Sequence, residues 1–390
     1  MPKPILASRI SRRLLLAGTA GAVASGLNGP SARADDASVM VGVSGPLTGQ
    51  YAQYGADWRR GFDLAVAEVN GTGGIDGRKL AYRFEDSQSD PRQTVAIAQK
   101  FVADPAVVVE LGDFSSAASM AASPIYQRAK LVQFGFTNSH PDFTKGGDYI
   151  WSNAPNQADD MPVLAAYALK LGLKRLSVAS INSDWGRTSA TLFGAAAKAG
   201  GATIAATESY LSTEQDYRSL LVRLRDAKPD GLVLISYYPD AALIVRQARD
   251  VGIGTPVVAA GSVYSPKFLE LAGDAANGVY TNTNFFPDDE RPAVQRFVTA
   301  YRAAYGGTPG FYAARGYDAM IVLATVMREF GTSRTAIRDG LVKVRDVPSV
   351  LFGSVQFDPE TRRVRRPASI DLEVRDGAFT IWDGKPAIAG

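Results

Sequence analysis

Short apolar runs alternate with helix-like segments along most of this 390-residue chain, and this alternation limits the folds open to it. The clearest instance begins with Val107 to Leu111, a β-branched run typical of a strand that is buried on both faces. The segment from Ala117 to Lys130 then predicts a helix, and Leu131 to Phe136 predicts the next strand. Strand, helix and strand in this order indicate a right-handed crossover in a parallel sheet.

The same pattern recurs on both sides of that segment. Val39 to Val43 and Leu80 to Glu85 predict strands before it, and the alternation restarts after a loop-like stretch from Asp142 to Gln157. Four more strands are expected in the second half, over 175–180, 203–209, 231–236 and 256–260. We therefore predict an α/β protein with two doubly wound parallel-sheet lobes and a crevice between their strand ends.

Two serines mark a candidate binding site at this crevice. Ser115 and Ser116 lie where a strand ends and a helix begins, so free N–H groups, the helix dipole and two hydroxyls converge on an anion there. The alternative is that either serine only caps the helix. Thr137, Trp185 and Tyr237 also follow predicted strands. Because ligands of such sheets lie at the carboxyl ends of strands, this shared placement favours ligand binding over capping.

Composition excludes several classes of function. The chain has no cysteine, so disulfides, cysteine nucleophiles and thiolate metal sites are excluded. It has one histidine, His140, and no G-x-S-x-G motif, which argues against a serine hydrolase built on Ser115 or Ser116. We expect a binding protein rather than an enzyme, with no cofactor and no metal.

The first 34 residues read as a cleaved export signal of the twin-arginine type. Arg12 and Arg13 precede an apolar stretch too short to span a bilayer, and 32–34 is a small-x-small cleavage pattern. Five of the 42 basic residues lie in this segment, which leaves 37 against 39 acidic residues and no basic field for nucleic acid. We expect a mature protein that starts near Asp35 and is free in the periplasm, because no cysteine is present to carry a lipid anchor.

Several ordered motifs resemble one protein family across nearly all of the mature chain. They are GVSGPLTGQYAQYG (42–55), AEVNGTGGIDGR (67–78), EDSQSDP (85–91), LGDFSS (111–116), SDWGR (183–187) and YPDAALIVRQARDVG (238–252). These motifs are similar to those of the periplasmic binding proteins of branched-chain amino-acid ABC transporters, which have the type I two-lobed fold. The resemblance implies a monomer that binds an amino acid or related small carboxylate and delivers it to a membrane permease. A sensor of the same fold that acts on a signalling partner is the alternative.

The resemblance also implies lobes joined by a three-crossover hinge, with residues 38–156 and 285–346 in the first lobe and 157–284 and 347–390 in the second. In the family, residues that match Ser116 and Thr137 hold the ligand carboxylate. The remaining positions expected at the ligand are the neighbouring backbone of Ser115, Ala117 and Gly135, the first-lobe aromatic residues Tyr54 and Tyr312, and the second-lobe residues Trp185, Tyr237 and Gly261. Core packing is the alternative role for each aromatic residue.

Two departures from the family pattern bear on the ligand. Some relatives have a cysteine pair where Ser89 and Ser115 stand. Amino-acid binders of the family also place an acid at the position of Gly261, where it neutralises the ligand's ammonium group. A buried ammonium without a counter-charge is costly. Either another acid replaces it, with Asp113, Asp184 and Asp240 as candidates, or the ligand has no α-ammonium group.

Overall fold

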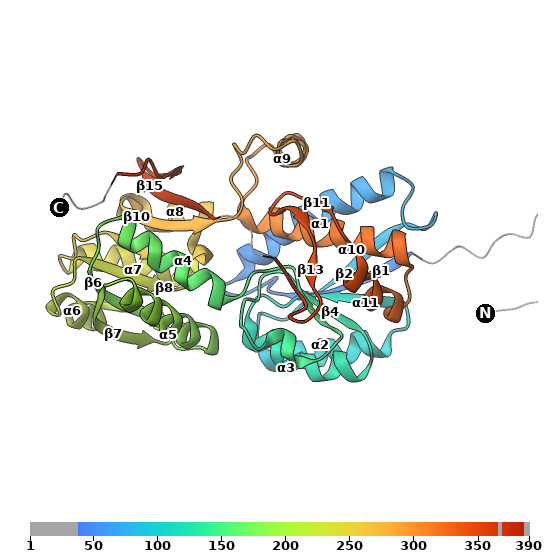
Figure 1. Ribbon diagram of the computed structural model, residues 1–390, viewed down its shortest axis with the longest axis horizontal. Helices are drawn as coiled ribbons and strands as arrows, with labels where there is room; N and C mark the ends of the chain where they lie inside the picture. The colour runs from blue at the N-terminus through green and yellow to red at the C-terminus, as the bar shows by residue number, and fades with distance from the viewer. Residues whose placement is uncertain (1–37, 366–368, 386–390) are drawn as a thin grey trace, which may run out of the picture. The chain divides into compact units, whose positions relative to one another are not determined.

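The structure is a computed structural model that describes residues 38–365 and 369–385. Its strands form two seven-stranded sheets, each largely parallel and flanked by helices, so the predicted two-lobed α/β fold is confirmed (Figure 1). The first sheet has the order β13-β14-β5-β4-β3-β1-β2, and the second has the order β16-β15-β10-β9-β8-β6-β7.

The first lobe contains the elements that precede α4 and those from α9 to β14. Its sheet strands are β1 (Val39–Gly45), β2 (Leu80–Asp86), β3 (Val107–Leu111), β4 (Val132–Gly135), β5 (Ile150–Ser152), β13 (Phe357–Asp358) and β14 (Arg363–Val364). Its helices are α1 (Ala52–Gly71), α2 (Pro91–Ala103), α3 (Ser116–Arg128), α9 (Pro292–Tyr305), α10 (Phe311–Phe330) and α11 (Arg334–Lys343), with the short 3-10 helix η1 (Phe143–Gly146). A separate pair is formed by β11 (Val347–Ser349) and β12 (Gly353–Val355).

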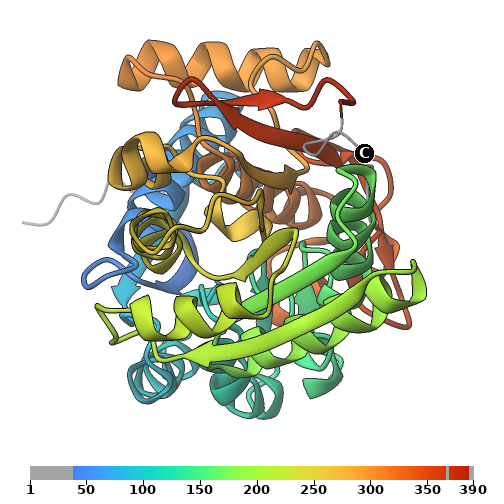
Figure 2. The same cartoon turned by 90° about the vertical axis from the view of Figure 1, so that its left-hand side faces the viewer.

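The second lobe repeats this arrangement. Its strands are β6 (Arg175–Ile181), β7 (Thr203–Tyr210), β8 (Gly231–Ile235), β9 (Val257–Ala259), β10 (Val279–Thr283), β15 (Ile370–Arg375) and β16 (Ala378–Ile381). Its helices are α4 (Gln157–Lys170), α5 (Asp184–Ala199), α6 (Arg218–Asp226), α7 (Tyr238–Asp250) and α8 (Pro266–Ala272), with 3-10 helices η2 (Gly261–Val263) and η3 (Gly273–Ala276). Figure 2 looks onto this lobe and shows helices on either side of its sheet.

Strand β8 shows why its apolar sequence needs helices on both faces. Leu232 and Leu234 belong to the hydrophobic cluster that includes α6 and α7, whereas Val233 and Ile235 belong to the cluster with α4 and α5. Successive side chains of a strand point to opposite faces, so a run without polar residues buries both. The apolar run therefore fixes β8 as an interior strand, and its carboxyl end carries Tyr237 to the space between the lobes.

Close packing of α1 against α10 sets one wall of that space. A Cβ atom on Gly61 would lie 2.1 Å from the carbonyl oxygen of Ala313, and one on Gly316 would lie 2.9 Å from the carbonyl oxygen of Trp58. No side chain other than hydrogen fits at either position. These two glycines therefore let the helices approach closely, which fixes the position of the first turn of α10.

The end of the chain divides between the lobes differently from the expectation. The resemblance implies that residues 347–390 belong as one piece to the second lobe, but β14 pairs with β5 through Arg363 and Ser152, and β13 pairs with β14. Phe357 also packs against Phe134 and Trp151 of the first lobe, with ring centroids 5.7 Å apart in both pairs. Only β15 and β16 join the second sheet. The third passage between sheets therefore falls between Val364 and Ile370, not near residue 346.

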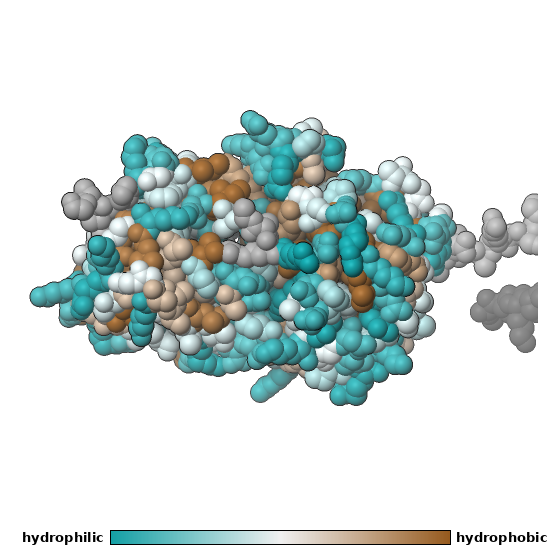
Figure 3. Space-filling model, viewed as in Figure 1, coloured by the Kyte–Doolittle hydropathy of each residue, from teal (hydrophilic) through white to brown (hydrophobic). Residues whose placement is uncertain are grey.

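The described residues include no helix that is both long and apolar enough to cross a membrane. On the face shown in Figure 3, apolar residues form small separate areas among polar ones. The predicted export signal, residues 1–34, lies outside the described residues.

Candidate functional site

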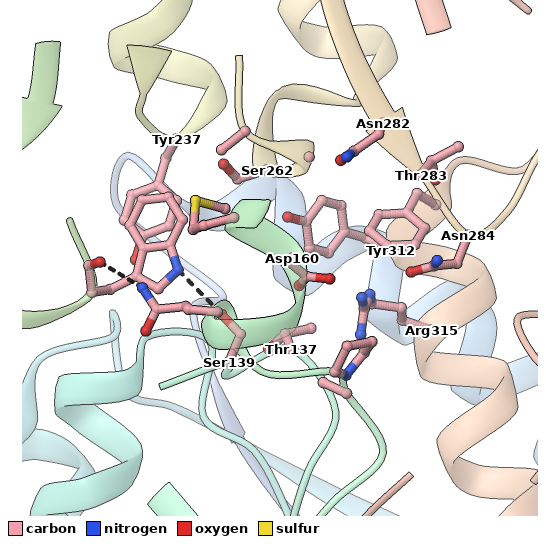
Figure 4. Close-up of a pocket in the computed structure, with 18 of the residues that line it drawn as sticks. Thr137, Ser139, Asp160, Tyr237, Ser262, Asn282, Thr283, Asn284, Tyr312 and Arg315 are labelled. Atoms are coloured by element: carbon pink, nitrogen blue, oxygen red, sulfur yellow. Dashed lines mark hydrogen bonds between the residues drawn. The ribbon is translucent and has the colours of Figure 1, made fainter. Parts of the chain in front are cut away.

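A cavity lies between the carboxyl ends of the strands of the two sheets (Figure 4). About 850 Å³ of space is free of protein atoms there, including the part that opens to solvent. The first lobe and the segment leading out of it contribute Phe114, Ser116, Thr137, Ser139, Ala154, Pro155, Phe311, Tyr312 and Arg315. The second lobe contributes Gln157, Asp160, Met161, Trp185, Tyr237, Ala260, Gly261, Ser262, Asn282, Thr283, Asn284 and Ser369.

The two adjacent serines have different roles at the start of α3. Ser115 is the N-cap, because its Oγ accepts the N–H of Ala118 at 3.2 Å, as the capping alternative predicts. Ser116 lines the cavity, and its Oγ accepts the N–H of His140 at 3.3 Å. Ala117 lines an adjoining pocket, which also includes Ser115 and Ser116. The positive end of the α3 dipole therefore faces this region of the cleft.

Thr137 follows β4 and lines the cavity beside this helix end. Its Oγ1 lies 3.4 Å from the carbonyl oxygens of Asp113 and Phe114, so the two strand ends are held together. Gly135 does not line the cavity. A Cβ atom there would lie 2.0 Å from Oδ1 of Asn138, so any larger residue would require that side chain to move.

The aromatic residues of the second lobe form one end of the cavity. The rings of Trp185 and Tyr237 are stacked, with centroids 4.9 Å apart, and both line the wall. The indole Nε1–H of Trp185 donates to Oγ of Ser139 at 3.2 Å, so this residue also joins the second lobe to the first (Figure 4). Phe114 completes the aromatic surface, 5.0 Å from the Tyr237 ring.

The two first-lobe tyrosines are placed differently. Tyr312, at the start of α10, lines the cavity. Tyr54 is fully buried behind it, with ring centroids 4.4 Å apart, and is not part of the wall. The hydroxyl of Tyr54 donates to the carbonyl oxygen of Ser262 at 3.0 Å and accepts the N–H of Tyr238 at 3.1 Å. Tyr54 therefore connects the lobes.

Gly261 lines the cavity, and the structure explains why no acid stands there. A Cβ atom at this position would lie 2.8 Å from the carbonyl oxygen of Asn282 in β10, so a larger residue would require the backbone to shift. None of the three acids considered as replacements lines the cavity. Asp113 accepts hydrogen bonds from Ser89 and Thr94.

The other two candidate acids are also engaged or placed elsewhere. Asp184 is exposed and pairs with Arg187. Asp240 faces a different pocket, where burial raises its pKa to about 7. The carboxylate group that does line the wall among the described residues is that of Asp160, in the first turn of α4.

Sequence reasoning missed Asp160 and Arg315, which carry the charged groups that the described residues contribute to the cavity wall. Acidic residues are common near helix N-termini because the helix dipole stabilises them there, so the sequence gives no sign that Asp160 lines a cavity. Arg315 lies three residues after Tyr312, on the same side of α10, and this spacing was the available signal. Its side chain is buried, and Nη1 donates to the carbonyl oxygen of Phe136 at 2.6 Å.

The ring of His140 makes its hydrogen bonds away from Ser116. His140 Nδ1 accepts the N–H of Asp142 at 3.1 Å, and Nε2 lies 3.3 Å from Oγ1 of Thr188. Ser116 contacts the backbone of His140 instead of its ring, so these residues do not form a nucleophile and base pair. The described part of the chain also contains no cluster of three acidic or histidine residues that could hold a metal ion.

Comparison with known proteins identifies the family. Residues 38–377 match the family model described as periplasmic binding protein. The leucine-specific-binding protein of Salmonella typhimurium is 30% identical over 335 residues, which are 84% of this chain and 88% of that protein. Leu/Ile/Val-binding protein homolog 1 of Brucella abortus is 27% identical over 349 residues, 89% of this chain and 92% of that protein.

A solved structure supports the same assignment. The branched-chain amino acid transporter substrate-binding protein LivJ of Streptococcus pneumoniae, in complex with isoleucine, is 25% identical with a TM-score of 0.81. The match covers 88% of this chain and 97% of that one. With its two-lobed fold, its interlobe cavity and a family match over most of its length, this chain belongs to the periplasmic binding protein family.

Proposed function

We propose that this protein is the solute-binding component of an ABC importer, which binds an amino acid or a related small carboxylate between its lobes and delivers it to a membrane permease. One observation carries the proposal: the cavity between the lobes is lined from both sides by strand ends and includes the start of α3. Ligands of open parallel sheets bind at such ends, and a helix N-terminus stabilises an anion there. The names of the Salmonella and Brucella relatives support an amino acid as the ligand.

The carboxylate of the ligand lies in this proposal at the start of α3. The hydroxyls of Ser116 and Thr137 donate to it, together with backbone N–H groups of the first turn, including that of Ala117. Trp185, Tyr237 and Tyr312 provide apolar surface for the rest of the ligand. Gly135 and Tyr54 act behind the wall, through the packing of Asn138 and the contact between the lobes.

The α-ammonium group of an amino acid needs a counter-charge, and Asp160 is the residue that we propose for it. Asp160 lies on α4 in the second lobe, whereas the start of α3 belongs to the first. An amino acid held by both would connect the lobes through its two charged groups. This gives ligand binding a direct means to favour the closed arrangement.

Export is the remaining part of the proposal. We propose that residues 1–34 are a twin-arginine type signal and that the mature protein starts near Asp35 in the periplasm. The lobes would then rotate about the three passages between the sheets as the ligand is bound and released.

Mass spectrometry of the ligand that co-purifies with the protein tests the binding function. We expect a small molecule with a carboxylate, whose rebinding after removal is measured by calorimetry. A panel of amino acids and matching 2-oxo acids should include at least one tight ligand. A protein that binds none of these and no other carboxylate would refute the proposal.

A further inference from the structure

Arg315 places a buried positive charge in the wall of the cavity. It lies on α10, one turn beyond Tyr312, and its side chain is 8% exposed. The guanidinium lies 4.4 Å from the centre of the Phe311 ring, and Nη1 donates to the carbonyl oxygen of Phe136. These two contacts fix its orientation without neutralising its charge.

The charge of Arg315 has no ion-pair partner among the residues that the structure describes. Within that set no carboxylate oxygen lies within 4.0 Å of its nitrogens, and the carboxylates of Asp160 and Asp318 act on it from beyond that distance. Asp318 accepts hydrogen bonds from Asn153 and from the N–H of Val350. A guanidinium has five N–H donors, so most of them remain available to a ligand. An unpaired buried charge is costly unless something in the cavity compensates it.

Arg315 lies at the opposite end of the cavity from Trp185 and Tyr237. Trp185, Tyr237 and Ser116 line both this cavity and the adjoining pocket, so they mark the end where the two meet. Arg315 lines this cavity only, and Figure 4 shows it across the cavity from Tyr237. The ring of Phe114 lies between those of Tyr237 and Tyr312, with centroid distances of 5.0 Å and 6.3 Å.

Ser116 at the start of α3 and the guanidinium of Arg315 therefore each favour an anion, and Thr137 lies next to Phe136, whose carbonyl oxygen holds Arg315. We infer that Arg315 binds a second acidic group of the ligand, so that the ligand is a small diacid or an acidic amino acid rather than a purely aliphatic amino acid. The fork of the guanidinium matches the two oxygens of a carboxylate. Asp160 lies in the same wall and would supply the counter-charge for the ammonium group of an acidic amino acid. The inference rests on the proposed function, because it assumes a carboxylate ligand in this cavity.

Calorimetry with matched acid and amide pairs tests the inference on the wild-type protein. The pairs are L-glutamate with L-glutamine, 2-oxoglutarate with 2-oxoglutaramate, and terephthalate with 4-carbamoylbenzoate. Each pair keeps size and shape while one acidic group becomes neutral. We expect the diacid to bind at least tenfold more tightly in any pair that binds. Binding of leucine or other monoacids without preference for the acid in any pair would overturn the inference and leave the proposed function intact.

Two variants assign the effect to Arg315. Arg315→Gln should reduce the preference for the diacid over its amide to less than about threefold, because only neutral hydrogen-bond donors then face the second acidic group. Arg334→Gln is the matched control, because Arg334 also donates to backbone carbonyls of the first lobe, among them those of Asp104 and Val107, but lies outside the cavity. The Arg334→Gln variant should keep the wild-type preference for the diacid over its amide.

Thermal unfolding of each variant reports whether it folds. If Arg315→Gln does not fold, Arg315→Lys keeps the charge but loses the fork, and we expect a smaller preference than in the wild type. A preference that survives in every folded Arg315 variant would overturn the inference. If no carboxylate of any kind binds, the proposed function fails and the inference fails with it.

Discussion

Tyr54→Phe removes a single oxygen atom from the contact between the lobes and leaves the cavity wall unchanged. The hydroxyl donates to the carbonyl oxygen of Ser262 and accepts the N–H of Tyr238, and both partners belong to the second lobe. The ring itself is fully buried, stacked on Phe114 with centroids 4.1 Å apart. A phenylalanine can keep this stack, so the change removes these two hydrogen bonds together with the interaction of the hydroxyl with Tyr312.

The size of the effect follows from these two bonds. Each intramolecular hydrogen bond contributes about 0.5–1.5 kcal/mol net, and a buried partner left unpaired costs about 1–3 kcal/mol. We therefore expect the closed arrangement to lose about 2 kcal/mol, whereas separated lobes expose the same groups to water. Because the ligand binds between closed lobes, its affinity should fall about 30-fold.

Calorimetry with the tightest ligand measures this loss, and small-angle scattering at saturating ligand checks that the variant still closes. Tyr82→Phe is the matched control, because its hydroxyl donates to Asp63 within the first lobe, outside the contact between lobes. Its affinity should equal that of the wild type. An unchanged affinity in Tyr54→Phe would refute the view that this hydroxyl stabilises closure.

Four further changes give separate tests. Ser116→Ala should weaken binding of a carboxylate by about 10- to 100-fold, because a hydrogen bond to a charged group contributes about 1.5–3 kcal/mol; calorimetry measures it. Asp160→Asn should weaken binding of L-glutamate at least tenfold more than that of 2-oxoglutarate, and equal losses would argue against an ammonium contact. Burial raises the pKa of Asp240 to about 7, so the folded protein should lose stability as the pH rises from about 4 to 7, and melting curves of Asp240→Asn should lack this decline. Replacing Arg12 and Arg13 together by lysine should abolish export, which cell fractionation detects.

Much of the fold and part of the candidate site could be predicted from sequence because both depend on local patterns. Apolar runs such as that of β8 require two covered faces, which leads directly to parallel sheets with helices on both sides. Residues just after such strands lie at one edge of the sheet. Ser116, Thr137, Trp185 and Tyr237 follow this rule, and the structure brings all four to the same cavity.

The remaining residues depend on packing between distant segments. The helix α10 is apolar on nearly every side, so its sequence does not indicate which residue faces the cavity. The close packing of α10 against α1 determines which side of α10 faces the cavity, and Arg315 reaches the wall as a result. The prediction that residues 347–390 all belong to the second lobe was wrong for a similar reason. Short strands such as β13 and β14 fit the edge of either sheet locally, and the contacts of Phe357 with the first lobe decide between them.

In the proposed function, Tyr54 and Trp185 act on lobe closure in different ways. Tyr54 joins the lobes from behind the wall, so it acts on closure without touching the ligand. Trp185 lines the wall and donates to Ser139 of the other lobe, so a ligand that orders its ring also orders a contact between the lobes. A ligand can shift the equilibrium only through interactions that differ between open and closed arrangements. In the proposed function Trp185 provides such an interaction, whereas the hydrogen bonds of Tyr54 set the open–closed equilibrium of the ligand-free protein.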